Sequence, residues 1–181
     1  MELNEAIETR RSVRKYTDQG ISDEDLREIV RLASYSPSWK NTQCVSWLVV
    51  ENKDLKSRIA EEGVCGYEFN CKTIKRCHAL AVLVTEKGKS GCEADGSFST
   101  SKKDTWEMFD AGIAAQTFCL AAKGLGIGTV ILGILDDAKI AEILGLPENK
   151  TVASCIAMGY PIKQGNMPPR KSVDELLEIR K

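Results

Sequence analysis

The stretch that most restricts the fold is AGIAAQTFCLAA, residues 111–122, which contains no charged side chain. It lies inside a longer pattern, 103–124, that predicts the longest helix of the chain. A helix without a charged face is expected to be buried nearly all round, and the small residues near its start would let another helix approach closely. A membrane span needs about 20 apolar residues, so this stretch indicates a core helix instead.

Four apolar segments rich in β-branched residues predict buried strands. They are 46–51, 79–86, 126–133 and 151–159. Further helical patterns occupy 2–10, 22–35, 53–62, 71–77, 136–145 and 173–180. Buried strands need cover on both faces, and these strands do not alternate regularly with helices. We therefore expect a single α+β domain over 1–181, a three-layer α/β/α sandwich with a mixed central sheet.

The composition argues against several classes of protein. With 25 Lys and Arg against 26 Asp and Glu, the net charge is -1, so the chain lacks the long-range positive field of a general nucleic-acid binder. The N-terminus, MELNEAIETRR, lacks the apolar core of a secretory signal, and we expect a cytoplasmic protein. The seven cysteines form no C-x-x-C pair, which favours reduced, structural thiols over a zinc or iron–sulfur site.

Three short patterns resemble known motifs but lie in the wrong context. GKS at 88–90 lacks the first glycine of a P-loop, because Leu83 stands in its place. GLGIG at 124–128 follows a helix and precedes a strand, the reverse of a dinucleotide-binding turn, so we expect its glycines to end the helix. His78 is the only histidine. A single histidine argues against a histidine-rich metal centre, and we expect a structural role for it.

Two clusters of cations lie near the two ends of the chain. The segment RRSVR contains Arg10, Arg11, Ser12 and Arg14, and the second cluster consists of Arg170 and Lys171. Guanidinium groups bind phosphate through paired hydrogen bonds, so the two clusters could grip one small dianion if the ends of the chain meet. Either cluster alone is typical of a solvated surface.

Two further segments carry side chains suited to a heteroaromatic ring. YSPSWKNTQ at 35–43 contains a rigid proline, Pro37, and YEFN at 67–70 ends in an asparagine. Their amide and hydroxyl groups could bind a ring edge, and the indole of Trp39 could cover a ring face. These polar side chains are Ser38, Asn41, Gln43 and Asn70. A third segment, 87–101, is polar and rich in glycine and serine, and we expect a loop that could form a lid.

The order of these motifs resembles the FMN-dependent nitroreductase family. The matching segments are RRSVR (10–14), PSWKNTQ (37–43), YEFN (67–70), DAGIAAQTFCLAAKGLGIGT (110–129) and RK (170–171). Each motif alone is weak, but the five follow one another in the family's order and cover essentially the whole chain.

The resemblance implies a fold, a partner and a cofactor. It implies an intertwined homodimer of α+β sandwiches with one FMN in each of two clefts between the subunits. By this likeness the segment 10–14 would hold the flavin phosphate and pyrimidine edge, and Asn70 would bind the pyrimidine. The residues that would close the cleft from the other subunit are Pro37, Ser38, Trp39 and Asn41. The strand segment that would pass the flavin comprises Val130, Ile131, Leu132 and Gly133, and Arg170 with Lys171 would complete the phosphate site.

The expected activity is that of an NAD(P)H-dependent FMN oxidoreductase. NADH or NADPH would reduce the flavin by hydride transfer, and the reduced flavin would then reduce a nitroaromatic, a quinone or a similar small acceptor. No catalytic side chain is nominated, because the chemistry would take place at FMN N5. Three alternatives stay open. They are a family member with a specialised reaction (dehydrogenation, dehalogenation or flavin fragmentation), a non-catalytic flavin-binding protein, and a cysteine-rich structural or metal-binding domain.

Overall fold

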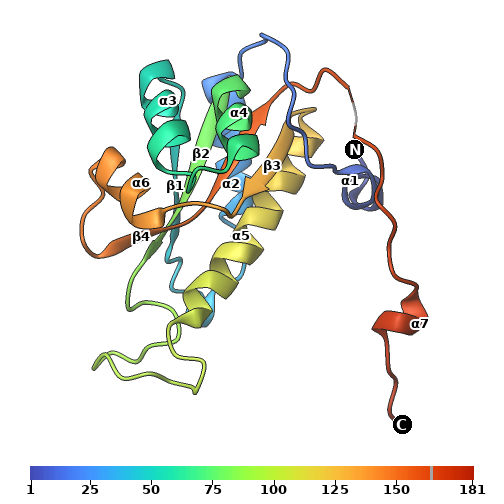
Figure 1. The fold of residues 1–181 in the computed structure, drawn as a ribbon. Coiled ribbons are helices and arrows are strands. Elements are labelled where there is room, and N and C mark those ends of the chain that lie inside the picture. Colours follow the sequence, from blue (N-terminus) through green and yellow to red (C-terminus); the bar gives the residue numbers. More distant parts are fainter. Residues whose placement is uncertain (164) are drawn as a thin grey trace.

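A computed structural model of the chain describes residues 1–163 and 165–181. The described residues form an α+β fold around one four-stranded sheet (Figure 1). The strands are β1 (Val45–Val50), β2 (Ala79–Glu86), β3 (Gly128–Leu132) and β4 (Lys150–Gly159). The helices are α1 (Leu3–Thr9), α2 (Asp23–Ala33), α3 (Lys53–Glu62), α4 (Glu68–Arg76), α5 (Thr105–Gly124), α6 (Asp137–Leu144) and α7 (Val173–Leu176), with a 3-10 turn η1 (Trp39–Asn41). Each expected helix and strand is present, and the last helix is shorter than the predicted 173–180.

The sheet is antiparallel, so the predicted mixed sheet is wrong for these four strands. Their order is β1-β2-β4-β3, and every neighbouring pair is antiparallel. The register of β3 and β4 shows how the antiparallel pairing of these two strands arises. Leu132, the last residue of β3, pairs with Cys155, whereas β4 begins at Lys150. Helix α6 therefore carries the chain past the end of β3 before β4 returns beside it. The parallel pairing found is one isolated bridge, between Ser12 and Thr129.

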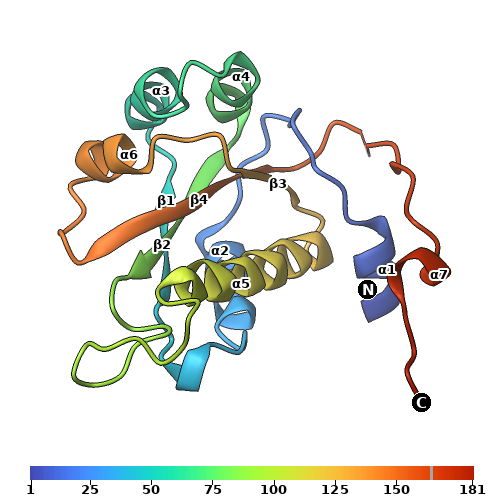
Figure 2. The same ribbon diagram turned by 60° about the horizontal axis from the view of Figure 1, so that its bottom comes forward.

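The two faces of the sheet bury two separate hydrophobic clusters. Strand side chains alternate between the faces, so Leu80 and Val82 join one cluster while Ala81 and Leu83 join the other. Helices α3, α4 and α6 cover the first face, and α2 and α5 cover the second (Figure 2). The sheet is thus shielded from water on both sides.

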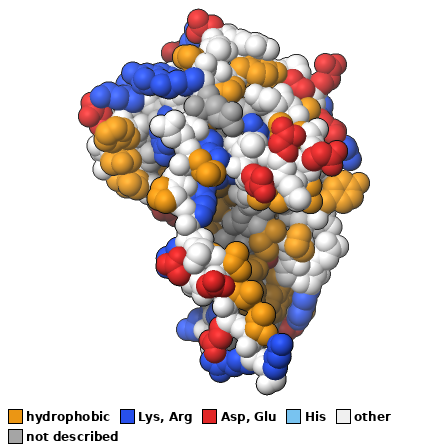
Figure 3. Space-filling view, turned by 90° about the vertical axis from the view of Figure 1, so that its right-hand side faces the viewer, with side chains coloured by type: hydrophobic (Ala, Val, Ile, Leu, Met, Phe, Trp, Pro, Cys, Tyr) orange, Lys and Arg blue, Asp and Glu red, His pale blue; other side chains and the backbone are white. Residues whose placement is uncertain are grey.

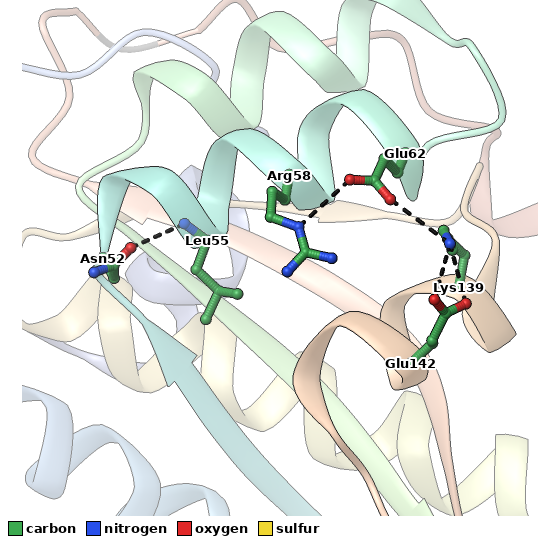
Figure 4. Close-up of polar contacts among 6 residues, drawn as sticks. All are labelled: Asn52, Leu55, Arg58, Glu62, Lys139 and Glu142. Atoms are coloured by element: carbon green, nitrogen blue, oxygen red, sulfur yellow. Dashed lines mark hydrogen bonds and ion pairs between the residues drawn. The ribbon is translucent and has the colours of Figure 1, made fainter.

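Local sequence signals fix the starts of several helices. The side chains of Ser22, Asn52 and Asp136 each accept a backbone N–H three residues further on, which satisfies a donor that the helix leaves unpaired. The ion pair between Glu62 and Lys139 joins α3 to α6, and Glu62 also pairs with Arg58 within α3 (Figure 4). The helices α3 and α6, which cover the first face of the sheet, are therefore held together by a surface ion pair as well as by their buried side chains.

Helix α5 has one exposed face, contrary to the burial all round that its sequence predicts. Phe118 and Cys119 are buried against the sheet. On the opposite side, a hollow of about 550 Å³ is lined by Met108, Phe109, Gly112, Ile113, Gln116 and Thr117. Phe109 is 59% exposed. Among the described residues, no helix has the length and hydropathy needed to cross a membrane.

Residues 165–181 form a C-terminal arm that extends away from the sheet (Figure 1). Its apolar side chains are exposed, among them Val173, Leu176, Leu177 and Ile179. Figure 3 views this side of the molecule and shows hydrophobic side chains on the surface that carries the arm. The arm therefore presents apolar groups that the rest of the described chain does not cover.

Candidate functional site

The cationic segment 10–14 lies along the edge strand β3. The Val13 backbone N–H donates to the Thr129 carbonyl at 2.9 Å, beside the bridge between Ser12 and Thr129. The Tyr16 hydroxyl lies 2.5 Å from the Val13 carbonyl and 3.2 Å from the Ala157 carbonyl, and donates to both. Burial of this phenol raises its pKa, so it stays a hydrogen-bond donor at neutral pH. The backbone that carries the arginines is therefore fixed to the sheet.

The arginines of this segment have no carboxylate partner within the described chain. Arg11 Nη1 donates to the carbonyls of Glu8 and Arg10, each at 2.7 Å. Arg14 is exposed and makes one long contact, 3.4 Å, with the Ser12 carbonyl. Arg10 and Arg11 also line a cavity of about 100 Å³ together with Lys123 and Gly128. Several cations without counter-charges around one hollow are suited to an anionic ligand.

Asn70 lies at the other end of the same strand. It is buried on α4, and its Nδ2 donates to the Ile134 carbonyl at 3.0 Å. Strand β3 pairs with β4 on one side only, so much of its outer backbone edge is free. From Thr129 to Ile134 the chain covers about 17 Å at strand spacing. The segment 10–14 and Asn70 thus lie at opposite ends of β3.

Within the predicted strand segment, alternate residues face opposite ways. The side chains of Val130 and Leu132 are buried in the core, whereas Ile131 is 44% exposed and Gly133 is exposed. The side chain of Ile131 and the backbone groups of the segment therefore remain available to a ligand. The predicted role of Val130, Ile131, Leu132 and Gly133, to offer backbone groups to the flavin, stays a prediction.

The predicted segment 37–41 lies far from the arginines of the segment 10–14 in the folded chain. The Trp39 backbone N–H donates to Asp110 Oδ2 at 2.9 Å, near the start of α5, whereas the arginines lie near Lys123, close to its end. These two positions on α5 are 13 residues apart, or about 20 Å at 1.5 Å per residue. One chain therefore does not bring the two halves of the predicted site together.

The segment 37–43 has an unusual backbone. Lys40, Asn41 and Gln43 have φ angles of 45°, 57° and 49°, in the left-handed region that costs a residue with a side chain about 1–2 kcal/mol. Ser38 Oγ accepts from the Gln43 N–H at 3.0 Å, and the exposed Lys40 pairs with Glu93. Strained backbone of this kind is concentrated at ligand-binding sites.

The sequence analysis missed Asp110, the carboxylate that holds this segment. It also accepts from Ser90 Oγ at 2.7 Å, and the neighbouring Glu107 accepts from the Gly88 N–H at 2.7 Å. The GKS motif is thus bound by carboxylates of α5. A signal was present, because Asp110 is the charged residue directly before the uncharged stretch 111–122.

The second cation cluster lies on the C-terminal arm. Arg170 Nη1 contacts the carbonyls of Pro168 and Pro169 at 3.4 Å each, and Lys171 is exposed. The arm passes the first cluster at Gly165, where an added Cβ would lie 3.5 Å from Arg11 Cβ. The described residues show no contact between Arg170 and the segment 10–14, so the shared phosphate site stays a prediction.

The remaining motifs have structural roles in the described chain. The turn after α5 ends the helix as predicted, because Gly126 has a φ of 78° and Ile127 N–H donates back to the Ala122 carbonyl. His78 Nε2 lies 3.1 Å from Glu51 Oε1. All seven cysteines are free, and no group of three His, Cys, Asp or Glu side chains in the described residues is arranged to hold a metal ion.

Comparison with known proteins agrees with this fold. The family model described as "Nitroreductase family" matches residues 7–70 and 67–160, which is most of the chain. The chain belongs to the nitroreductase family. A protein of Archaeoglobus fulgidus whose name ends in NAD(P)H nitroreductase is 35% identical over 159 residues, covering 86% of this chain and 83% of that protein.

Two more similar proteins show how far the similarity extends. The FMN reductase [NAD(P)H] of Bacillus subtilis is 28% identical over 180 residues, covering 93% of this chain and 70% of that protein. The crystal structure of a nitroreductase family protein from Clostridium novyi NT superposes with a TM-score of 0.76 at 28% identity. That superposition covers 89% of this chain and 86% of the other.

Proposed function

We propose that this protein is a cytoplasmic, homodimeric NAD(P)H-dependent FMN oxidoreductase that reduces a nitroaromatic, a quinone or a similar electron-poor acceptor. Membership of the nitroreductase family supports the reaction class. Relatives named NADPH-flavin oxidoreductase and FMN reductase support the cofactor. The observation that carries the proposal for this chain is the set of unpaired arginines fixed along β3, with Asn70 at the far end of that strand.

The described residues fit an elongated ligand with an anionic end and a polar ring. Arg10, Arg11 and Arg14 offer guanidinium donors that no described carboxylate occupies, and the Ser12 hydroxyl lies among them. Asn70 is held by its bond to Ile134, which leaves its amide in a fixed orientation. A fixed donor set needs little reorganisation when charge develops on the ligand.

The bound FMN would supply the chemistry, by accepting a hydride from NAD(P)H and passing electrons to the acceptor. The residues of the chain would bind, orient and shield it. Arg14, close to Ser12 on the exposed side, would stabilise negative charge on the ring of the reduced cofactor. Ile131 and the backbone at Gly133 would cover one ring face, because they are the exposed groups of the β3 segment.

The proposal requires two copies of the chain in each site. The arginines and the segment 37–41 lie near opposite ends of α5, about 20 Å apart along its axis, so they can enclose one ligand only if they come from different copies. The exposed apolar face of α5 and the apolar side chains of the arm provide surface for such a contact. Arg170 and Lys171, which lie on the arm, would then approach a phosphate from this surface.

Three measurements on the purified protein test the proposal. We expect a yellow protein that releases FMN on denaturation, a mass in solution of two 19.9 kDa chains, and bleaching of the flavin absorption when NADH or NADPH is added without oxygen. Reoxidation by a nitroaromatic or a quinone should follow in the second half-reaction. A protein that neither contains nor binds FMN, or whose flavin neither nucleotide reduces, would contradict the proposal.

A further inference from the structure

Asp110 is a buried carboxylate for which the described chain provides no cation. It is 3% exposed and lies near the start of α5. Its Oδ2 accepts from the Trp39 N–H at 2.9 Å and from Ser90 Oγ at 2.7 Å, and it lies 3.7 Å from Cys44 Sγ. Because a buried polar group is costly unless hydrogen bonds compensate it, these donors stabilise the carboxyl group at this position.

The donors of Asp110 belong to two loops that the sequence separates. Trp39 lies within the strained segment 37–43 and Cys44 directly follows it, whereas Ser90 lies in the loop 87–103. The two loops also meet through the ion pair between Lys40 and Glu93. The Trp39 ring packs directly on α5, where its centroid lies 4.8 Å from that of Trp106. Asp110 is thus the buried point at which both loops are joined to α5.

The strain of the segment 37–43 explains why such an anchor is needed. Three residues with side chains adopt left-handed backbone conformations within four positions. Backbone of this kind persists only where the surrounding structure holds it. The exposed pair of Lys40 with Glu93 is a weak restraint, because solvent screens it. The bond from Trp39 to Asp110 is the hydrogen bond that joins the segment to α5.

We infer that Asp110 is a positioning residue of the flavin site. It fixes the segment 37–43 in the conformation that closes over the flavin bound by the other copy of the chain. This inference rests on the proposed function, since it assumes that the segment contacts FMN. Asp110 itself touches no part of the cofactor in this account, and it acts through Trp39 and the strained backbone that follows.

The test compares Asp110→Asn and Asp110→Ala with the matched control Glu107→Gln. Glu107 is a second buried carboxylate, three residues earlier on the same helix, and it binds the loop 87–103 at Gly88 but not the segment 37–43. Asparagine keeps an oxygen that can accept from Trp39, whereas alanine removes it. We expect the dissociation constant of FMN to rise roughly tenfold or more in Asp110→Ala, less in Asp110→Asn, and not in Glu107→Gln.

A second readout separates positioning from stability alone. Near-ultraviolet circular dichroism of the FMN-free variants reports on Trp39 and Trp106, and it should change in the Asp110 variants while the dimer and the far-ultraviolet spectrum persist. The inference is overturned if both Asp110 variants bind FMN as tightly as the unaltered protein, or if Glu107→Gln weakens FMN equally. If the unaltered protein itself fails to bind FMN, the proposed function falls and this inference with it.

Discussion

The substitution Gly128→Ala tests how the cationic segment is held against the sheet. Gly128 begins β3, and a Cβ added there would lie 2.7 Å from Val13 Cγ2, 2.8 Å from Val13 Cβ and 3.0 Å from Val13 Cγ1. Val13 is buried and donates its N–H to Thr129, so it cannot move away without disturbing that bond. The added methyl group must therefore displace the segment that carries the arginines.

The magnitude follows from overpacking. Inserting a methyl group into a well-packed core costs about 1–3 kcal/mol, which for a chain of this length lowers the melting temperature by about 2–4 °C per kcal/mol. If the segment moves, the arginines should also bind FMN less well. The FMN dissociation constant should then rise roughly tenfold for each 1.4 kcal/mol of binding free energy that is lost. Urea unfolding and flavin titration measure the two effects separately.

Two further variants make the Gly128 experiment decisive. Gly124→Ala is the matched control, because a Cβ at Gly124 meets nothing within 4 Å, and it should leave stability and FMN binding nearly unchanged. Val13→Ala removes two of the three contacting atoms, so the double variant should be less destabilised than the sum of the two single changes. Equal stabilities for Gly128→Ala and Gly124→Ala, with equal FMN affinities, would refute the reasoning.

Three other changes have defined outcomes. Arg14→Gln removes a cation without a carboxylate partner, so FMN should bind roughly 10–100 times more weakly while thermal stability is retained, and an unchanged flavin titration would contradict this. Tyr16→Phe removes the donor to two carbonyls and should lower the free energy of unfolding by about 1–3 kcal/mol, as measured in urea. Burial raises the pKa of Cys77 to about 11 and that of Cys155 to about 12. Unfolded thiols ionise near pH 8.5, so the contribution of these two thiols to stability should be constant below that pH and fall above it, by about 1.4 kcal/mol per pH unit for each thiol. A flat stability profile between about pH 8.5 and pH 10 would contradict the last expectation.

Local patterns were enough to predict most of the secondary structure. The strands β2 and β4 are buried on both faces, so their apolar runs are continuous and easy to detect. The end of α5 was predictable for the same local reason, because Gly126 supplies the left-handed residue that a helix end of this type requires. In both cases a short segment contains the whole physical cause of its structure.

Features that depend on distant segments were not predictable in the same way. The direction of β4 depends on where α6 ends relative to β3. The residue pattern of a strand carries no information about that position. The role of Asp110 depends on donors at Trp39 and Ser90, 71 and 20 positions away. Of the left-handed residues, Asn41 belongs to a type that tolerates this conformation, but Lys40 and Gln43 do not, so the sequence carried little signal for the strained turn beyond its proline and polar residues.

The wrongly predicted burial of α5 is itself an argument for the proposed dimer. A helix face that meets water normally carries charges, yet the exposed face from Gly112 to Thr117 carries none. In a dimer with a two-fold axis, a helix that crosses the axis at about a right angle meets its own copy in an antiparallel direction. The start of α5, which holds Trp39 through Asp110, would then lie beside the end of the other α5, where the arginines are. One antiparallel contact would thus cover the uncharged face and bring together the two halves of the site that a single chain keeps about 20 Å apart.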